Sequence, residues 1–76
     1  MSPKTPSVSG QQLVRVLEKL GFVVKRQKGS HVQLFRERDR CFTTIPIHGK
    51  KELPIGTLKA ILKDAEISVN ELNELL

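Results

Sequence analysis

The sequence predicts a small α+β domain, in which a three-stranded antiparallel sheet carries helices on one face. Two helix-start patterns flank three short strand-like stretches, and only brief turn signals separate the strands. Turns this short join antiparallel neighbours, because parallel strands need a long crossover connection. The 76 residues are enough for one such domain. The expected order of elements is α-β-β-β-α-α.

The first helix is expected over about residues 10–20. Ser9 and Gln12 have the spacing of a capping box, in which each side chain binds the other residue's backbone N–H. One apolar stripe follows at i, i+3, i+4 and i+7, formed by Leu13, Val16, Leu17 and Leu20. Gly21 should end the helix, because glycine readily takes the left-handed conformation of a helix stop.

Three strand-like stretches follow, at about residues 22–27, 31–36 and 41–47. The turn Lys28-Gly29-Ser30 separates the first two, and the polar run Glu37-Arg38-Asp39-Arg40 separates the last two. Pro46 has no N–H to donate to a neighbouring strand, so we expect the third strand at an edge of the sheet.

Two helices are expected in the C-terminal part of the chain. The first covers about residues 57–65, after Pro54 and Gly56. Ser68 and Glu71 form a second capping box, which precedes a short helix at about residues 69–75.

We expect residues 1–7 to be a disordered tail and residues 8–76 to be a single domain. The single Cys41 cannot form an internal disulfide, and one Cys with two His gives no zinc-site spacing, so no metal or cofactor is expected. The longest apolar run has only three residues, which excludes a membrane span. The first ten residues contain no apolar stretch, so we expect no secretion signal. A cytoplasmic protein is therefore expected.

The charge of the chain is positive and uneven. Thirteen Lys and Arg against eight Asp and Glu give a net charge of +5. Residues 1–51 hold eleven basic and three acidic residues (+8), and residues 52–76 hold two and five (−3). This distribution favours a polyanion such as a nucleic acid as partner. The alternative is a surface that only keeps the protein in solution.

Alternation along the strands predicts which side chains the uncovered sheet face presents. Val32 and Leu34 should face the helices, as should Ile45 and Ile47. The opposite face then carries both histidines and two of the three phenylalanines, in the set His31, Gln33, Phe35, Phe42, Thr44, Pro46 and His48. A slip of one residue in either strand would exchange the two sets.

His31 is the candidate catalytic residue. Histidines titrate near neutral pH, with an ordinary pKa of ~6.5, so His31 could take a proton from the 2′-OH that RNA itself carries. Such a reaction would need no metal. His48 is the candidate for the complementary acid. The alternative is that both histidines are ordinary polar surface residues.

The residues before His31 suit the binding of a phosphate. Arg26 and Lys28 supply positive charge, Gly29 lets the backbone come close, and Ser30 offers a hydroxyl donor. Near the second long helix, Lys50 and Lys51 are further candidates for phosphate contacts. The alternatives are a plain hairpin turn at residues 28–30 and a solvated loop at residues 50–51.

In order and spacing, these segments resemble the HicA (YcfA-like) family, the toxins of bacterial type II toxin–antitoxin pairs. The resemblance covers about residues 8–76 and is carried by Ser9-Gly10, the Leu13/Leu17/Leu20 stripe, Leu20-Gly21-Phe22, Gln27-Lys28-Gly29-Ser30-His31, Ile45-Pro46-Ile47-His48-Gly49, Glu52-Leu53, Gly56-Thr57-Leu58, Ile61-Leu62, Ala65 and Ile67-Ser68. The family pattern usually has glycine after Ala65, where this chain has Glu66.

The resemblance implies a fold like that of double-stranded-RNA-binding domains, α-β-β-β-α, here with a short extra C-terminal helix. It also implies metal-independent cleavage of mRNA, which inhibits translation and growth. The catalytic histidine of the family lies in the Gly-Ser-His segment, which places it at His31. The implied partners are mRNA and a HicB-type antitoxin that covers the active site, with no membrane and no small-molecule cofactor.

Three hypotheses follow from these observations. The first is an endoribonuclease that acts through His31. The second is a non-catalytic RNA-binding module with the same fold, and the third is an interaction protein that uses its helical or acidic C-terminal surface. RNA that is shortened on a gel would indicate the first, and RNA that is only shifted would indicate the second. Binding driven by charge must weaken as salt rises.

Overall fold

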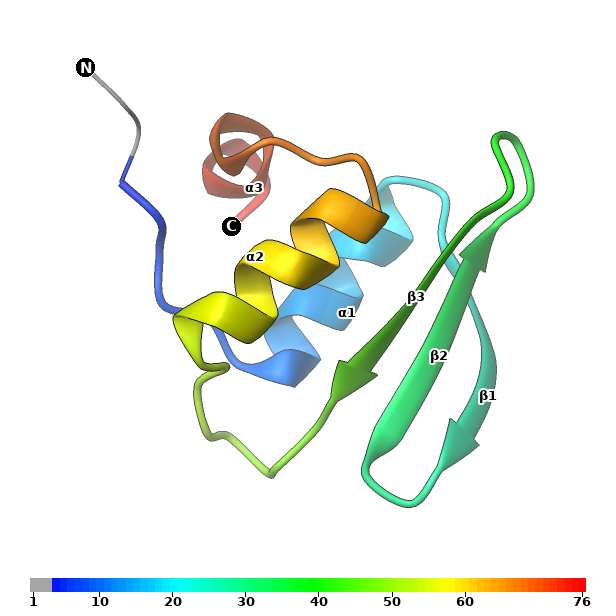
Figure 1. Ribbon diagram of the computed structural model, residues 1–76, viewed down its shortest axis with the longest axis horizontal. Coiled ribbons are helices and arrows are strands. Elements are labelled where there is room, and N and C mark those ends of the chain that lie inside the picture. Colours follow the sequence, from blue (N-terminus) through cyan, green and yellow to red (C-terminus); the bar gives the residue numbers. More distant parts are fainter. Residues whose placement is uncertain (1–3) are drawn as a thin grey trace.

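The computed structural model describes residues 4–76, and this part contains three helices and three strands (Figure 1). In chain order they are α1 (Gly10–Lys19), β1 (Val23–Lys28), β2 (His31–Arg36), β3 (Cys41–Pro46), α2 (Ile55–Asp64) and α3 (Val69–Leu75). The predicted α+β class and element order are confirmed. Residues 1–3 of the predicted tail lie outside the described residues.

The three strands form one antiparallel sheet in the order β1-β2-β3. Both long helices lie on the same side of this sheet, and α3 lies next to them (Figure 1). Pro46 ends β3, which is an edge strand, so the expectation based on its missing N–H is confirmed. Within residues 4–76, no helix combines the length and the apolar character that a membrane span requires.

Both ends of α1 follow the predicted signals. The backbone N–H of Gln12 donates to Ser9 Oγ (3.2 Å), and the N–H of Ser9 donates to Gln12 Oε1 (2.9 Å). At the other end Gly21 has φ 93°. The N–H of Phe22 then donates to the carbonyl of Leu17 (3.0 Å). The capping box and the glycine stop are both confirmed.

The ends of α2 differ from the expectation in two details. The helix begins at Ile55, two residues earlier than predicted. Pro54 (φ −56°) is compatible with this start, because the N–H that proline lacks would have no partner within the helix there. At the other end Glu66 takes φ 57°, and the N–H of Ile67 donates to the carbonyl of Leu62 (2.9 Å). The left-handed position that usually holds glycine is thus filled by Glu66, at a cost of about 1–2 kcal/mol.

The core lies between the sheet and the helices, and every element except β1 contributes to it. Its buried apolar side chains are Val8, Leu13, Val16, Leu17, Phe22, Val32, Leu34, Ile45, Leu53, Leu58, Ile61, Leu62, Ala65, Ile67 and Leu72. The alternation predicted for β2 is confirmed, since Val32 and Leu34 are buried while His31 is exposed. All six residues of β1 are exposed, so this strand is held mainly by its ladder to β2.

Thr43 occupies a core position of β3, opposite Leu34. Its side chain is buried, and its hydroxyl has no hydrogen-bond partner within residues 4–76. Because an unpaired buried hydroxyl is costly, we expect Thr43→Val to raise the free energy of unfolding by about 1 kcal/mol. Urea unfolding followed by circular dichroism measures this change. Thr44→Val, on the opposite face, is the control, and an unchanged midpoint for Thr43→Val would contradict the prediction.

Candidate nucleic-acid interface

The turn between β1 and β2 places His31 at the tip of a hairpin. Lys28 and His31 are the last cross-strand pair, so Gly29 and Ser30 form a two-residue turn. Gly29 has φ 59°, a conformation that glycine takes without strain, and a Cβ there would meet no atom within 4 Å. The carbonyl of Ser30 accepts a hydrogen bond from the N–H of Ile47 (2.6 Å). This bond fixes the open turn to the end of β3.

His31 is exposed and stands in a row of three cross-strand residues. Its partner in β1 is Lys28, and its partner in β3 is Pro46. Residues that lie opposite each other in paired strands share a face of the sheet. Lys28 and Pro46 therefore flank His31 on the open face, which is the face predicted for it from the alternation in β2.

Alternation back from Lys28 brings a second cation to this face. Arg26 lies two residues before Lys28 and opposite Gln33, so both cations share the face that carries His31. A β-bulge interrupts β1 just before Arg26. The register shifts by one residue between Val24 and Arg26, so Lys25 is an extra residue in the strand, and Val23 rather than Val24 lies on the face of His31. Alternation alone misses the bulge, because it depends on pairing with the neighbouring strand.

The other end of the open face is aromatic. Phe35 lies directly opposite Phe42, so the two form a cross-strand pair on the face predicted for both. Lys25 Nζ lies 5.8 Å from the centre of the Phe35 ring, within the range of a cation–π contact. Phe42 keeps 52% of its surface exposed. It is therefore also accessible to a stacked base of an RNA strand.

His48 follows β3 and lines a hollow of about 340 Å³ together with Pro46, Lys51 and Thr57. Pro46 is also the cross-strand partner of His31, so this hollow adjoins the row that contains His31. The N–H of Lys51 donates to the carbonyl of His48 (3.0 Å) and closes a tight turn. The structure therefore groups His48 with Lys51.

Lys50 belongs to a different hollow, which it lines with Ser9 and Arg15 near the start of α1. The two neighbouring lysines thus serve two separate hollows. Both lie shortly before α2, which begins at Ile55. They are therefore closer to the start of this helix than the sequence predicted.

A close contact between α1 and the end of β3 holds the loop that carries His48. Gly10, the first residue of α1, lies so close to the carbonyl oxygen of Pro46 that a Cβ would collide with it. The N–H of Leu53 donates to the carbonyl of Val8 (2.8 Å). The loop is therefore anchored at both ends to the start of α1.

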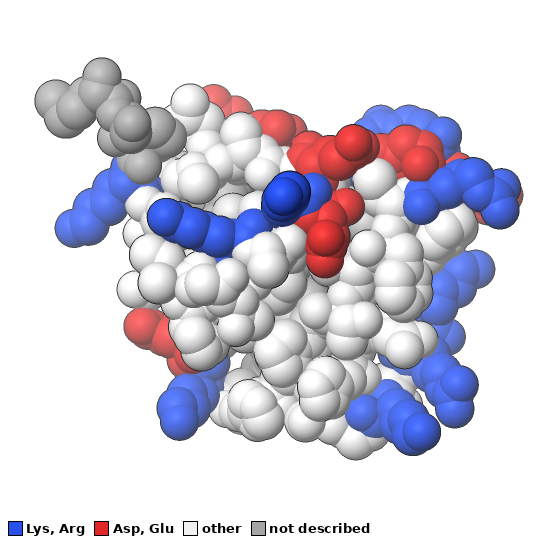
Figure 2. All heavy atoms as spheres, in the orientation of Figure 1, with Lys and Arg blue, Asp and Glu red and all other residues white. Residues whose placement is uncertain are grey.

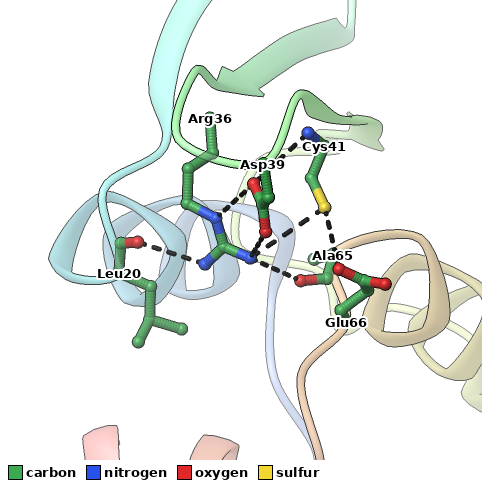
Figure 3. A network of polar contacts seen from close by, with 6 residues as sticks. All are labelled: Leu20, Arg36, Asp39, Cys41, Ala65 and Glu66. Atoms are coloured by element: carbon green, nitrogen blue, oxygen red, sulfur yellow. Dashed lines mark hydrogen bonds and ion pairs between the residues drawn. The ribbon is translucent and has the colours of Figure 1, made fainter.

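Arg36 forms a buried network on the helix side of the sheet, which the sequence analysis missed (Figure 3). Its guanidinium binds both carboxylate oxygens of Asp39, through Nε (3.0 Å) and Nη2 (2.7 Å). It also donates to the carbonyls of Leu20 (3.2 Å) and Ala65 (3.2 Å). The ring of Phe22 lies 4.5 Å from the guanidinium carbon. Arg36 thereby ties β2 to the C-terminal ends of α1 and α2.

Asp39, Cys41 and Glu66 surround this guanidinium and have metal-ligand atoms within 4.8 Å of one another. Cys41 Sγ donates to Glu66 Oε2 (3.4 Å) and lies 4.0 Å from Arg36 Nη2 (Figure 3). Burial and the neighbouring carboxylates raise the pKa of the Cys41 thiol. Arg36 is paired with Asp39 in this group, and its positive charge disfavours a cation beside it.

The ion pair makes stability sensitive to acid. The hydrogen bond from Arg36 holds the pKa of Asp39 well below its usual value. A lowered pKa in the folded state gives stability that is present above about pH 4 and is lost as the pH falls further. We expect the urea midpoint of the wild type to fall more steeply between about pH 5 and pH 3 than that of Asp39→Asn. Parallel pH curves for the two proteins would contradict this prediction.

The surface charge is uneven in space as well as in the sequence. Exposed cations of β1 are Lys25, Arg26 and Lys28. Figure 2 shows Lys and Arg side chains projecting from the side of the molecule where the sheet lies, while Asp and Glu gather near the end of α2 and the β2–β3 turn. The hairpin with His31 is therefore on the basic side, which favours an anionic partner there.

Comparison with known proteins agrees with this architecture. A family model described as the HicA toxin of bacterial toxin–antitoxin systems matches residues 10–67, from the first residue of α1 to just beyond α2. A search of curated proteins gave no match. The matched range includes the hairpin of His31 and the loop of His48. It covers well over half of the chain, which therefore belongs to the HicA toxin family.

Proposed function

We propose that this protein is the RNA-cleaving toxin of a type II toxin–antitoxin pair. It acts in the cytoplasm as an endoribonuclease that cuts mRNA, and it thereby inhibits translation and growth. Membership of the HicA toxin family supports the toxin assignment. The observation that carries the RNA chemistry is the exposed His31 at the hairpin tip, with Arg26 and Lys28 on the same face of the sheet.

In the proposed reaction His31 takes the proton from a 2′-OH of the RNA. The 2′ oxygen attacks the adjacent phosphorus and forms a new P–O bond, while the bond between phosphorus and the 5′ oxygen of the next nucleotide breaks. An acid returns a proton to that leaving oxygen, and His48 is the candidate for this role. The products are a 2′,3′-cyclic phosphate and a 5′-hydroxyl. Because the RNA supplies the nucleophile, the residues need no metal or cofactor for this step.

The positive charges around the hairpin would bind the reacting phosphate. Arg26 and Lys28 are close enough to His31 along the ladder to stabilise the extra negative charge of the transition state. Gly29 leaves open space in front of the backbone, and Ser30 adds a hydroxyl. Two further lysines would bind phosphates away from the cleaved bond. Lys51 would bind one in the hollow that His48 lines, and Lys50 would bind one in the hollow at the start of α1.

A HicB-type antitoxin would act by covering the same open face. Phe42 and Val23 are 52% and 58% exposed, and both belong to the face that carries His31. Exposed apolar side chains beside a functional site are typical of protein contact surfaces. Antitoxin and RNA should therefore exclude each other. The measurement adds antitoxin to a complex of the protein with fluorescently labelled RNA and follows the release of the RNA. Simultaneous binding of both would contradict this arrangement.

The requirement for the 2′-OH tests the proposed reaction most directly. Cuts are first mapped on a mixed-sequence mRNA in excess EDTA. A short RNA that contains one cut site is then compared with a matched RNA that has a single 2′-deoxy nucleotide at that site. We expect cleavage of the first and none of the second. Equal cleavage of both would contradict the mechanism. Salt-sensitive binding without any cleavage would identify a non-catalytic RNA-binding module instead.

A further inference from the structure

Two hollows meet on the exposed side of α1. The first, here called the α1 groove, has a volume of about 390 Å³. It lies between Gln11 and Arg15 of α1 on one side and Gln27, Val32 and Ile47 on the other, the last of which directly follows β3. The second, of about 330 Å³, is the hollow at the start of α1 that Lys50 lines. Gln11 and Arg15 line both hollows, so the two form one continuous track along the helix.

The α1 groove lies beside the hairpin that carries the candidate catalytic residue. Its wall contains the pair Gln27 and Val32, which is the next pair along the ladder after Lys28 and His31. Successive pairs point to opposite faces of the sheet. A strand bound at His31 on the open face therefore needs only to pass around the hairpin tip to reach the groove. Ile47, which also lines the groove, is hydrogen-bonded to the carbonyl of this turn.

The chemistry of the track suits a polyanion with polar groups. Arg15 and Lys50 are exposed, and among residues 4–76 neither is within ion-pair distance of an acid. Gln11 and Gln27 add amide donors and acceptors along the track. Glu18 and Glu52 also line parts of the track. The free cations on one continuous path match the phosphates of a single-stranded nucleic acid, whose bases and sugars can use the amides.

We propose that the RNA strand cut at His31 continues around the hairpin tip into the α1 groove, where Arg15 and Lys50 bind its phosphates. This inference rests on the proposed function, because it extends the path of the same substrate. It adds a second binding segment, on a helix and on the opposite side of the sheet from the reacting phosphate. The length of RNA that the protein holds should then exceed what the open face alone can contact.

The test uses the full chain with His31→Ala, so that bound RNA stays intact. Fluorescently labelled single-stranded RNAs of about 4 and about 16 nucleotides are compared. Adding Arg15→Gln should weaken binding of the longer RNA about tenfold, because one charge-assisted phosphate contact is lost. The slope of log affinity against log salt should become shallower by about 0.7. Lys50→Gln should behave in the same way, and the shorter RNA should be little affected.

Lys59→Gln is the matched control, because Lys59 is an exposed cation of α2 that lies on neither hollow. It changes the net charge equally and should leave the affinity for the longer RNA nearly unchanged. If Arg15→Gln and Lys59→Gln reduce this affinity equally, the effect is one of net charge and the proposed path is wrong, while RNA cleavage by the wild type would still stand. If the parent chain binds neither RNA, the proposed function fails together with the path.

Discussion

The His31→Ala protein is expected to cleave RNA about 10²–10⁴-fold more slowly than the wild type, the usual effect of removing a general base. His31 is exposed at the first position of β2 and contributes nothing to the core. Its removal should therefore leave the fold unchanged. The neighbouring charges of Arg26 and Lys28 would still bind the RNA. Binding should survive while cleavage is lost.

The measurement follows cleavage of a mixed-sequence mRNA in excess EDTA by equal amounts of both proteins. Circular dichroism checks that the variant is folded, and a gel shift checks that it binds RNA. Gln33→Ala provides the matched control, because Gln33 lies two residues along β2 on the same face but its amide does not act as a general base. Equal cleavage by the wild type and the His31 variant would contradict the assignment of His31 as the general base.

The Arg36→Met protein is expected to lose about 3 kcal/mol of folding free energy. The methionine would keep much of the apolar volume but leave the carbonyls of Leu20 and Ala65 without their donor. It would also remove the ion pair with Asp39 and the contact with the ring of Phe22. A small domain has only about 5–15 kcal/mol in total, so this loss is a large fraction.

Urea unfolding of both proteins near neutral pH measures the effect of Arg36. Arg38→Met is the control, since Arg38 lies in the same β2–β3 turn but is exposed. Its midpoint should stay close to that of the wild type. A variant at position 36 that unfolds at the wild-type midpoint would show that the network of Figure 3 contributes little to stability.

Local signals predicted most of the fold. The two capping boxes and the glycine stop depend on residues three or four positions apart, so they can be read without knowing the rest of the structure. The faces of β2 follow from simple alternation. One face packs on the core, so every second residue of the strand is buried. The early start of α2 was missed because a proline fits directly before the first turn of a helix and does not delay it.

The features missed from the sequence depend on contacts between distant segments. The bulge at Lys25 arises from pairing with β2, and it decides that Val23 rather than Val24 shares a face with His31. Extending the alternation of β2 by one more step would have placed Arg36 on the helix side, and Asp39 three residues later was the available signal for its partner. Only the packed structure shows that the C-terminal ends of α1 and α2 supply the other acceptors of the Arg36 guanidinium.

The anchoring of the His48 loop determines when, during synthesis of the chain, the surface around His31 can form. His31 leaves the ribosome well before Ile47, whose N–H holds the hairpin turn, and before Leu53, whose N–H holds the loop to Val8. Contacts between residues so far apart in the chain form only when the later partner is present. A growing chain that already contains His31 therefore still lacks the assembled surface. The messenger being translated meets that surface only once most of the protein has been made.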